Sequence, residues 1–159
     1  MKLICCDPGK NGGFAWTNGD GEVGCARMPA TEGDVIDLLR SARANGIERM
    51  ILEDQTGCVG PNMRVSAPSS FTFGRGFGVI LGAAQSMGFQ VELVRAQKWQ
   101  KALSLGTKKD AGGNSAWKWK LKAHAQRLFP SAQVTLETAD ALLLIEYAKL
   151  NRVWNTNNS

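Results

Sequence analysis

The sequence predicts an α/β fold, a five-stranded mixed sheet flanked by helices, and three observations support this prediction. Five short apolar runs, each ended by a turn or by charged residues, have the length and composition of strands. Segments of helical periodicity separate the later runs, so helical crossovers must join parallel strands there. With 43% apolar residues among 159, the chain can close one core but hardly two, which predicts a single domain over 1–159. The expected strands are 2–6, 14–17, 22–27, 47–54 and 89–94.

The first three strands should form an antiparallel meander that leads into a helix. The turn residues NGDG at 18–21 suit a tight hairpin, because Asn-Gly readily adopts positive φ values. Thr31 followed by Asp34 resembles a capping box, and apolar residues at helical spacing continue until Gly46. We therefore expect a helix between Thr31 and Gly46, followed by the fourth strand.

Beyond the fourth strand, two stretches lack periodicity. Residues 55–70 contain two prolines, two glycines and three serines, which predicts a long loop. Loops of that length inside a compact domain are usually functional or mobile. Residues 104–114 form a second loose connection. The helices expected in this part of the chain are 71–88, 96–103, 115–128 and 137–151.

The composition excludes several classes of protein. No run of 18 or more apolar residues occurs and Asp7 interrupts the N-terminal apolar run, which predicts a soluble cytoplasmic protein with no membrane partner. The four cysteines contain no Cys-x-x-Cys pair and His124 is the single histidine. This pattern argues for reduced, buried thiols and against a zinc site.

Charge is distributed unevenly along the chain, whose net charge is +5. Residues 61–130 carry 11 basic and 2 acidic side chains, whereas residues 1–60 carry 6 and 9. A solvated surface accounts for scattered lysines but not for this imbalance. The basic segment 61–130 therefore favours a polyanionic partner.

Four acidic residues can meet at one rim of the predicted sheet. Asp7 and Glu53 end the first and fourth strands, and they share an edge if those strands are neighbours. Glu137 and Asp140 are three residues apart on the last expected helix and so lie on one of its faces. Asp54 should point to the opposite face of the sheet from Glu53.

Each acid also has an ordinary structural explanation, since an Asp before a turn is commonly a cap and Glu137 can complement a helix dipole. A convergent cluster, however, would repel itself without a cation, and divalent cations with oxygen ligands relieve such repulsion. Two magnesium ions could activate a water, stabilise charge on a phosphate and hold the leaving oxygen. The four acids therefore predict phosphodiester hydrolysis without a protein nucleophile.

Four segments, taken in order, resemble the RuvC family of crossover junction endodeoxyribonucleases. They are CDPGKNGG (6–13), ILEDQ (51–55), GRGFGVILGAA (74–84) and ETADAL (137–142). The resemblance covers about 1–150 and implies an RNase H-like fold, a homodimer, and cleavage of four-way DNA junctions with magnesium or manganese. It implies that the four acids are the catalytic residues, although Glu137 stands where family members often have aspartate. So compact an enzyme of DNA recombination and repair would suit a bacterium or a phage-infected cell.

Basic and aromatic residues of the basic segment are expected to contact DNA. Phosphate contacts would supply affinity rather than sequence preference. The phenylalanines at 71 and 73 could wedge against bases at a branch point, or cap the core instead. The candidate DNA-binding residues are Arg64, Phe71, Phe73, Arg75, Lys98, Lys101, Lys108, Lys109, Lys118, Lys120 and Lys122.

Glycines and tryptophans in the same segment predict further contacts. Gly74, Gly78 and Gly82 leave a smooth helix stripe, which close packing against the sheet or a second subunit must compensate. Trp117 and Trp119 cannot both face inward, because residues two apart on a helix point about 200° away from each other. At least one of them should meet DNA, a partner or solvent.

The sequence therefore predicts a structure-selective endonuclease that resolves Holliday junctions and other branched DNA. Three alternatives stay open: an RNase H-like nuclease of other specificity, a non-catalytic branched-DNA-binding module, and an actin-like ATPase. RNase H-type enzymes place a glutamate on the first helix, where this chain offers only Glu32 near the start. The four acids argue against the binding module, and the chain is short for the two domains of the ATPase.

Overall fold

The structure is a computed structural model that describes residues 1–18, 20–55 and 66–151. Its centre is a five-stranded sheet with the order β3-β2-β1-β4-β5. The strands are β1 (Lys2–Asp7), β2 (Gly13–Asn18), β3 (Val23–Arg27), β4 (Arg49–Asp54) and β5 (Gln90–Arg95). The first three are antiparallel neighbours, whereas β4 and β5 run parallel to β1. The predicted mixed sheet is confirmed, with each strand boundary within two residues of its expected place.

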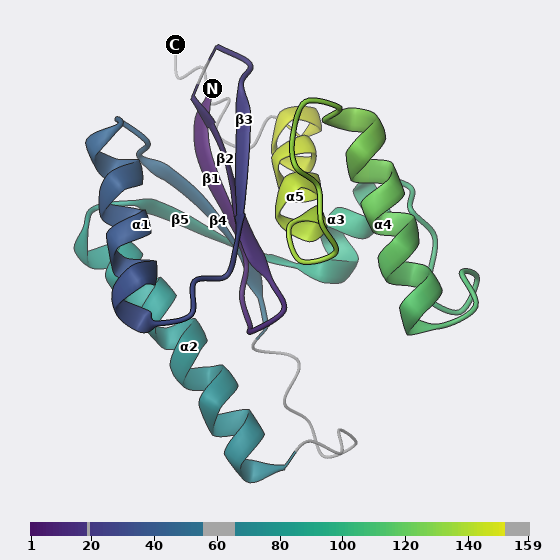
Figure 1. Ribbon diagram of the computed structural model, residues 1–159, viewed down its shortest axis with the longest axis horizontal. Helices are drawn as coiled ribbons and strands as arrows, with labels where there is room; N and C mark the ends of the chain where they lie inside the picture. Colours follow the sequence, from purple (N-terminus) through teal and green to yellow (C-terminus); the bar gives the residue numbers. More distant parts are fainter. Residues whose placement is uncertain (19, 56–65, 152–159) are drawn as a thin grey trace.

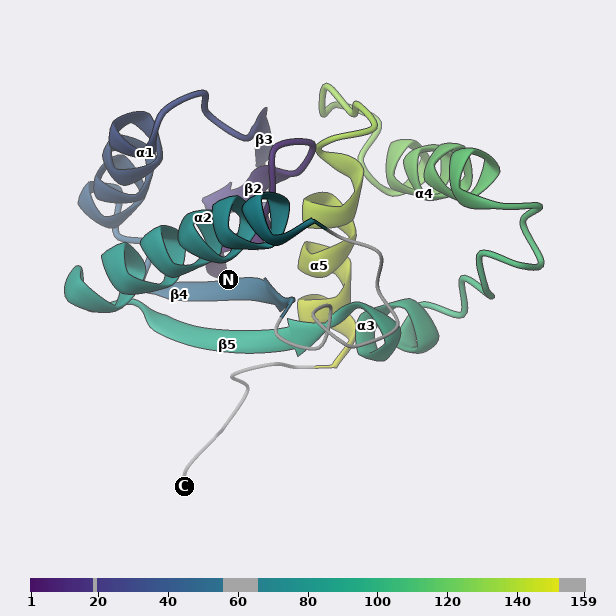
Figure 2. The same cartoon turned by 90° about the horizontal axis from the view of Figure 1, so that it is seen from below.

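Helices cover both faces of the sheet (Figure 1). One face carries α1 (Glu32–Ala44) and α2 (Ala67–Ser86). The other carries α3 (Ala96–Ala102), α4 (Asn114–Leu128) and α5 (Ala139–Leu150). Figure 2 shows α5 between the sheet and α4, so α4 forms an outer layer. Among the described residues, no helix combines the length and the apolar character needed to cross a membrane.

The alternation of residues along the strands separates two cores. Cys5 and Ile51 belong to the core beneath α3, α4 and α5, whereas Cys6 belongs to the core beneath α1 and α2. Both thiols are buried, as predicted, whereas Cys25 on β3 is only half-buried; all three are free, and Cys58 lies outside the described residues. The same alternation directs Asp7, two residues after Cys5, toward the α5 side of the sheet.

Side-chain caps explain where the first two helices begin. Thr31 accepts a hydrogen bond from the Asp34 backbone N–H at 3.1 Å, which confirms the predicted start of α1. The prediction of a loop through residue 70 is wrong, because α2 begins at Ala67. Ser66 caps it by accepting from the backbone N–H of Ser69 at 3.3 Å, and a proline in the first turn suits a helix start. The phenylalanines at 71 and 73 therefore lie on a helix.

The glycine stripe of α2 packs against no other described part of the molecule. A Cβ atom added at Gly74, Gly78 or Gly82 would meet no described atom within 4 Å outside the backbone of its own helix. The sheet is thus excluded as the partner of this stripe. Packing against a second subunit remains a prediction.

Candidate active site

Two strand ends and one helix start bring three carboxylates together on the α5 side of the sheet. Cys6 pairs with Leu52 in the parallel register of β1 and β4, so the next residues, Asp7 and Glu53, lie side by side. Asp7 is 7% exposed and Glu53 is 6% exposed. Asp140, in the first turn of α5, is 7% exposed. Burial of three carboxylates is costly unless other groups compensate their charge.

The pKa values of these carboxylates are shifted upward together. Burial raises the pKa of Asp7 well above its usual value, and the charges of Glu53 and Asp140 raise it further. Burial also raises the pKa of Glu53 to about 7, with a further contribution from the charge of Asp140. The pKa of Asp140 is raised by burial as well. The three groups therefore lie within electrostatic range of one another, and we call them the carboxylate cluster.

Two neighbours fix the carboxylate of Glu53. The indole N–H of Trp99 donates to Oε2 at 2.8 Å, and Nε2 of Gln55 donates to Oε1 at 2.8 Å. Trp99 is fully buried, and its N–H provides the polar partner that a buried carboxylate requires. Sequence analysis missed both partners, because no spacing in the chain connects a tryptophan of α3 with the end of β4.

Lys118 enters the carboxylate cluster from α4. Its Nζ donates to Oδ2 of Asp140 at 3.1 Å. The neighbouring Trp117 and the next-turn Leu121 pack into the core beneath α4, which turns Lys118 toward the start of α5. Burial lowers the pKa of Lys118, but the charges of Asp140 and Asp7 outweigh this effect and raise it. Sequence analysis expected Lys118 on a phosphate-binding surface, whereas the structure places it among the carboxylates.

The cluster fits a divalent cation by chemistry and charge. Oδ1 of Asp140 is a buried oxygen with no hydrogen-bond partner in the described part of the chain, so it can accept a cation. Carboxylate oxygens are the ligands that Mg²⁺ prefers. Lys118, Trp99 and Gln55 already engage other oxygens of Asp140 and Glu53. Among the described residues, no three His, Cys, Asp or Glu side chains are arranged to hold one ion. The carboxylate oxygens of the cluster would therefore have to reorient in order to share one.

The raised pKa of Glu53 predicts that stability falls as pH rises. Its folded value is about 7 and its usual value is 4.5, so between these values the folded protein binds more protons than the unfolded chain. The free energy of unfolding is therefore higher below this window, and this group lowers it by up to about 3 kcal/mol above the window. Thermal unfolding in EDTA should give a Tm lower by roughly 5–10 °C at about pH 8 than at about pH 5.

Glu53→Gln is the matched control for this pH dependence, because its amide oxygen can still accept from Trp99. In this variant the fall in Tm between the two pH values should be smaller. Added Mg²⁺ at the higher pH should raise the Tm of the wild type more than that of the variant, because a ligand stabilises the state that binds it. A wild-type Tm that stays level or rises would contradict the raised pKa.

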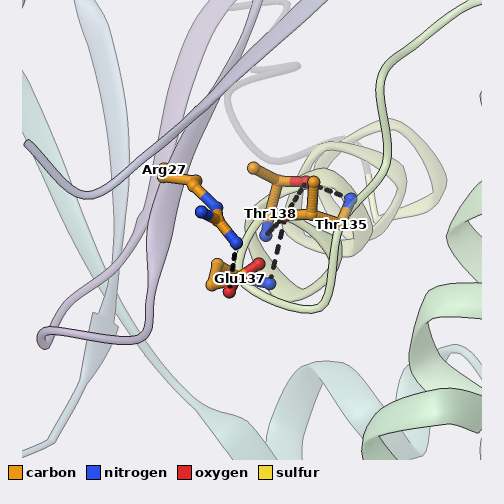
Figure 3. A network of polar contacts seen from close by, with 4 residues as sticks. All are labelled: Arg27, Thr135, Glu137 and Thr138. Carbon is orange, nitrogen blue, oxygen red and sulfur yellow. Dashed lines mark hydrogen bonds and ion pairs between the residues drawn. The ribbon is translucent and has the colours of Figure 1, made fainter.

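Glu137 lies in the turn before α5, so the prediction that it shares a helix with Asp140 is wrong. Its carboxylate accepts from Nη2 of Arg27 on β3 at 2.7 Å (Figure 3). The hydroxyl of Thr135 accepts from the backbone N–H groups of Glu137 and Thr138, which fixes the turn. Hydrogen bonding by Thr135 and by its own backbone N–H, together with Arg27, lowers the pKa of Glu137.

Glu137 nevertheless stands close to the carboxylate cluster. Gly13 pairs with Asp7 across β1 and β2, and a Cβ atom at Gly13 would lie 3.0 Å from the carbonyl oxygen of Glu137. The backbone of Glu137 thus lies beside β2, the strand next to Asp7, while the carboxylate of Glu137 accepts from Arg27. Direct metal binding by Glu137 remains a prediction.

The candidate DNA-binding lysines occupy different positions around the cluster. Lys108 is exposed, and its positive charge lowers the pKa values of Glu53 and Asp140, which places it near the cluster. Lys122 is half-buried on α4. The other candidate lysines besides Lys118 are exposed, namely Lys98, Lys101, Lys109 and Lys120.

The remaining DNA-binding candidates lie on or before α2. Phe71 is 72% exposed, whereas Phe73 lies against the turn after β1, 3.2 Å from a Cβ atom placed at Gly9. Nε of Arg75 pairs with Glu32 of α1 at 2.7 Å. Arg64 lies outside the described residues. DNA contact by all of these residues remains a prediction.

Comparison with known proteins identifies the fold. No protein-family model matches the chain, and no curated protein matches it. A Thermus thermophilus RuvC structure in complex with a Holliday junction substrate matches with a TM-score of 0.63 and 15% identity. A second Thermus thermophilus RuvC structure matches with a TM-score of 0.60 and 18% identity, and each match covers 98% of both chains. The predicted RNase H-like fold is confirmed, and identities this low show the fold alone.

Proposed function

We propose that this chain is a divalent-metal-dependent endonuclease that cuts branched DNA, such as four-way junctions. The meeting of Asp7, Glu53 and Asp140 at one edge of the sheet carries this proposal. The three carboxylates are buried, and the charge of Asp140 raises the pKa values of both Asp7 and Glu53. Oδ1 of Asp140 has no hydrogen-bond partner among the described residues. The fold shared with RuvC supports nuclease activity, and the neighbour solved with a Holliday junction supports a branched substrate.

Each residue of the site has a defined part in this proposal. Asp7, Glu53 and Asp140 would hold Mg²⁺ or Mn²⁺, with two ions per active site. When bound, the ions would lower the pKa of a water and neutralise charge on the phosphate. Trp99 orients the Glu53 carboxylate, and Lys118 offsets negative charge so that a phosphodiester can approach. Glu137 would become a further metal ligand if its carboxylate exchanged the ion pair with Arg27 for the cation.

Cleavage of a labelled four-way junction, compared with a linear duplex of the same sequence, tests the proposal. We expect products from the junction with Mg²⁺, none in EDTA, and much slower cleavage of the duplex. Equal rates on both substrates would favour an RNase H-like nuclease of other specificity. Binding without cleavage would favour a non-catalytic branched-DNA-binding module. The hydrogen bond of Lys118 to Asp140, which offsets charge without a metal, favours this second candidate.

The proposal includes a homodimer, because two symmetric cuts across a junction require two sites at a fixed separation. Among the described residues, the glycine stripe of α2 faces open space, so we expect it to be available to a second copy. Gly78→Leu should keep the fold, since its Cβ atom meets no described atom within 4 Å and leucine favours a helix by about 1 kcal/mol relative to glycine. Light scattering should show half the wild-type mass, and junction cleavage should be lost.

Gly78→Ala is the matched control for the dimer, because it adds a single methyl group at the same place. Its mass should stay closer to that of the wild type, and its Tm should not fall. A monomeric wild type, or an unchanged mass for Gly78→Leu, would contradict a dimer built on this stripe.

A further inference from the structure

α4 carries an exposed aromatic side chain that the proposed metal chemistry does not use. Trp119 is 56% exposed, whereas Trp117 is 2% exposed. Successive residues of a helix are about 100° apart, and Trp117, Leu121 and Ala125 of α4 are all buried in the core. Trp119 therefore points away from that core. An indole in water is available for an interaction partner.

The surface around Trp119 is basic and adjoins the carboxylate cluster. Nζ of Lys122 lies 4.9 Å from the centre of the Trp119 ring. Lys118, one residue before Trp119 and one turn before Lys122, donates to Asp140. α4 contains no acidic residue and four basic residues, namely Lys118, Lys120, Lys122 and Arg127. Lys118 and Lys122 thus lie on α4 between its core-facing residues and Trp119, with Lys118 bonded to the cluster and Lys122 over the exposed ring.

A second copy of the chain does not suit this surface. In a twofold interface the same patch meets itself, so the lysines of α4 would face lysines of the other copy. No acidic side chain on α4 would offset that repulsion. A nucleic-acid strand, in contrast, presents phosphates to the lysines and a flat base to the indole.

We propose that Trp119 stacks on an unpaired base of bound DNA, with Lys122 on the adjacent phosphate. This inference rests on the proposed function, whose substrate is DNA held beside the carboxylate cluster. Bases inside a continuous duplex are covered on both faces by their neighbours. A base can therefore reach the indole only where the strand is unpaired, as in a single strand or at an opened branch point. Trp119 is thus a source of preference for DNA with unpaired bases.

Binding without cleavage tests this role of Trp119. Fluorescence anisotropy in EDTA compares a labelled single strand with a duplex of the same length. Trp119→Ala should weaken single-strand binding about tenfold, in line with the loss of one base–aromatic stack, and should change duplex binding less than about twofold. Trp119→Phe should retain most of the affinity, because a phenyl ring still stacks. A 2-aminopurine in the single strand should be quenched by the wild type and not by Trp119→Ala.

Leu150→Ala is the control, because it removes a side chain that is 61% exposed at the opposite end of α5 from Asp140. It should leave both affinities unchanged. Unchanged binding by Trp119→Ala, equal losses for single strand and duplex, or a change in its mass in solution would overturn the stacking proposal. A wild type that shows the Trp119 effect but cleaves no junction would support stacking and defeat the proposed nuclease.

Discussion

Asp7→Asn should lower the rate of junction cleavage by at least about a thousandfold and leave junction binding intact or tighter. Asparagine keeps the shape of the side chain but removes a charge that would bind the cation, and it reduces repulsion of the DNA phosphates. The variant should also unfold at a higher temperature in EDTA. The charges of Glu53 and Asp140 raise the pKa of Asp7, so replacing Asp7 with a neutral side chain removes its repulsion with both carboxylates. Single-turnover cleavage, anisotropy and thermal unfolding measure the three effects.

Asp54→Asn is the matched control for Asp7→Asn. Asp54 follows Glu53 directly, but alternation along β4 points it to the other face, where its carboxylate lies 3.4 Å from Nε of Arg95. Cleavage by this variant should stay within a few-fold of the wild-type rate, since asparagine keeps the shape of a side chain that points away from the carboxylate cluster. Residual cleavage by Asp7→Asn within about tenfold of the wild-type rate would contradict the assignment of Asp7 to the metal site.

The parts of the site that lie on strands were predictable from the sequence. A strand has a fixed period of two, so the positions of Asp7 and Glu53 at strand ends determine their face once the strands are neighbours. β1 and β4 are such neighbours, because Cys6 pairs with Leu52 in their parallel register. Asp140 was also predictable, because it lies in the first turn of an apolar helix that must pack on the sheet.

The parts of the site that depend on local hydrogen bonds or on packing between distant helices were not predictable. The spacing of Glu137 and Asp140 favoured one helix, but the hydroxyl of Thr135 accepts two backbone N–H groups and holds a turn instead. From the sequence, Lys118 has the features of a surface lysine, and only the packing of α4 against α5 brings it to Asp140. A single sequence contains no signal for that packing, or for the pairing of Arg27 with Glu137.

Lys118→Met should lower junction cleavage about a hundredfold with little change in affinity, whereas Lys122→Met should weaken binding and leave the single-turnover rate nearly unchanged. Methionine keeps a long apolar stem in place of each lysine and removes one charge. Lys118 lies 3.1 Å from Oδ2 of Asp140, whereas Lys122, one turn later, lies over the ring of Trp119. The two variants therefore lose the same charge from the same helix at different distances from the cluster.

A pH profile separates the two lysines further. The charge of Lys118 lowers the pKa values of Asp7, Glu53 and Asp140, so its removal should raise all three. Protons then compete with the cation up to a higher pH, and the acidic limb of the cleavage profile should move upward in Lys118→Met only. If both variants instead lose affinity equally with unmoved profiles, Lys118 is a phosphate contact of the kind that sequence analysis expected. The 3.1 Å contact with Asp140 favours a shifted profile in Lys118→Met only, because an ammonium bonded to a buried carboxylate has its largest effect on the pKa of that carboxylate.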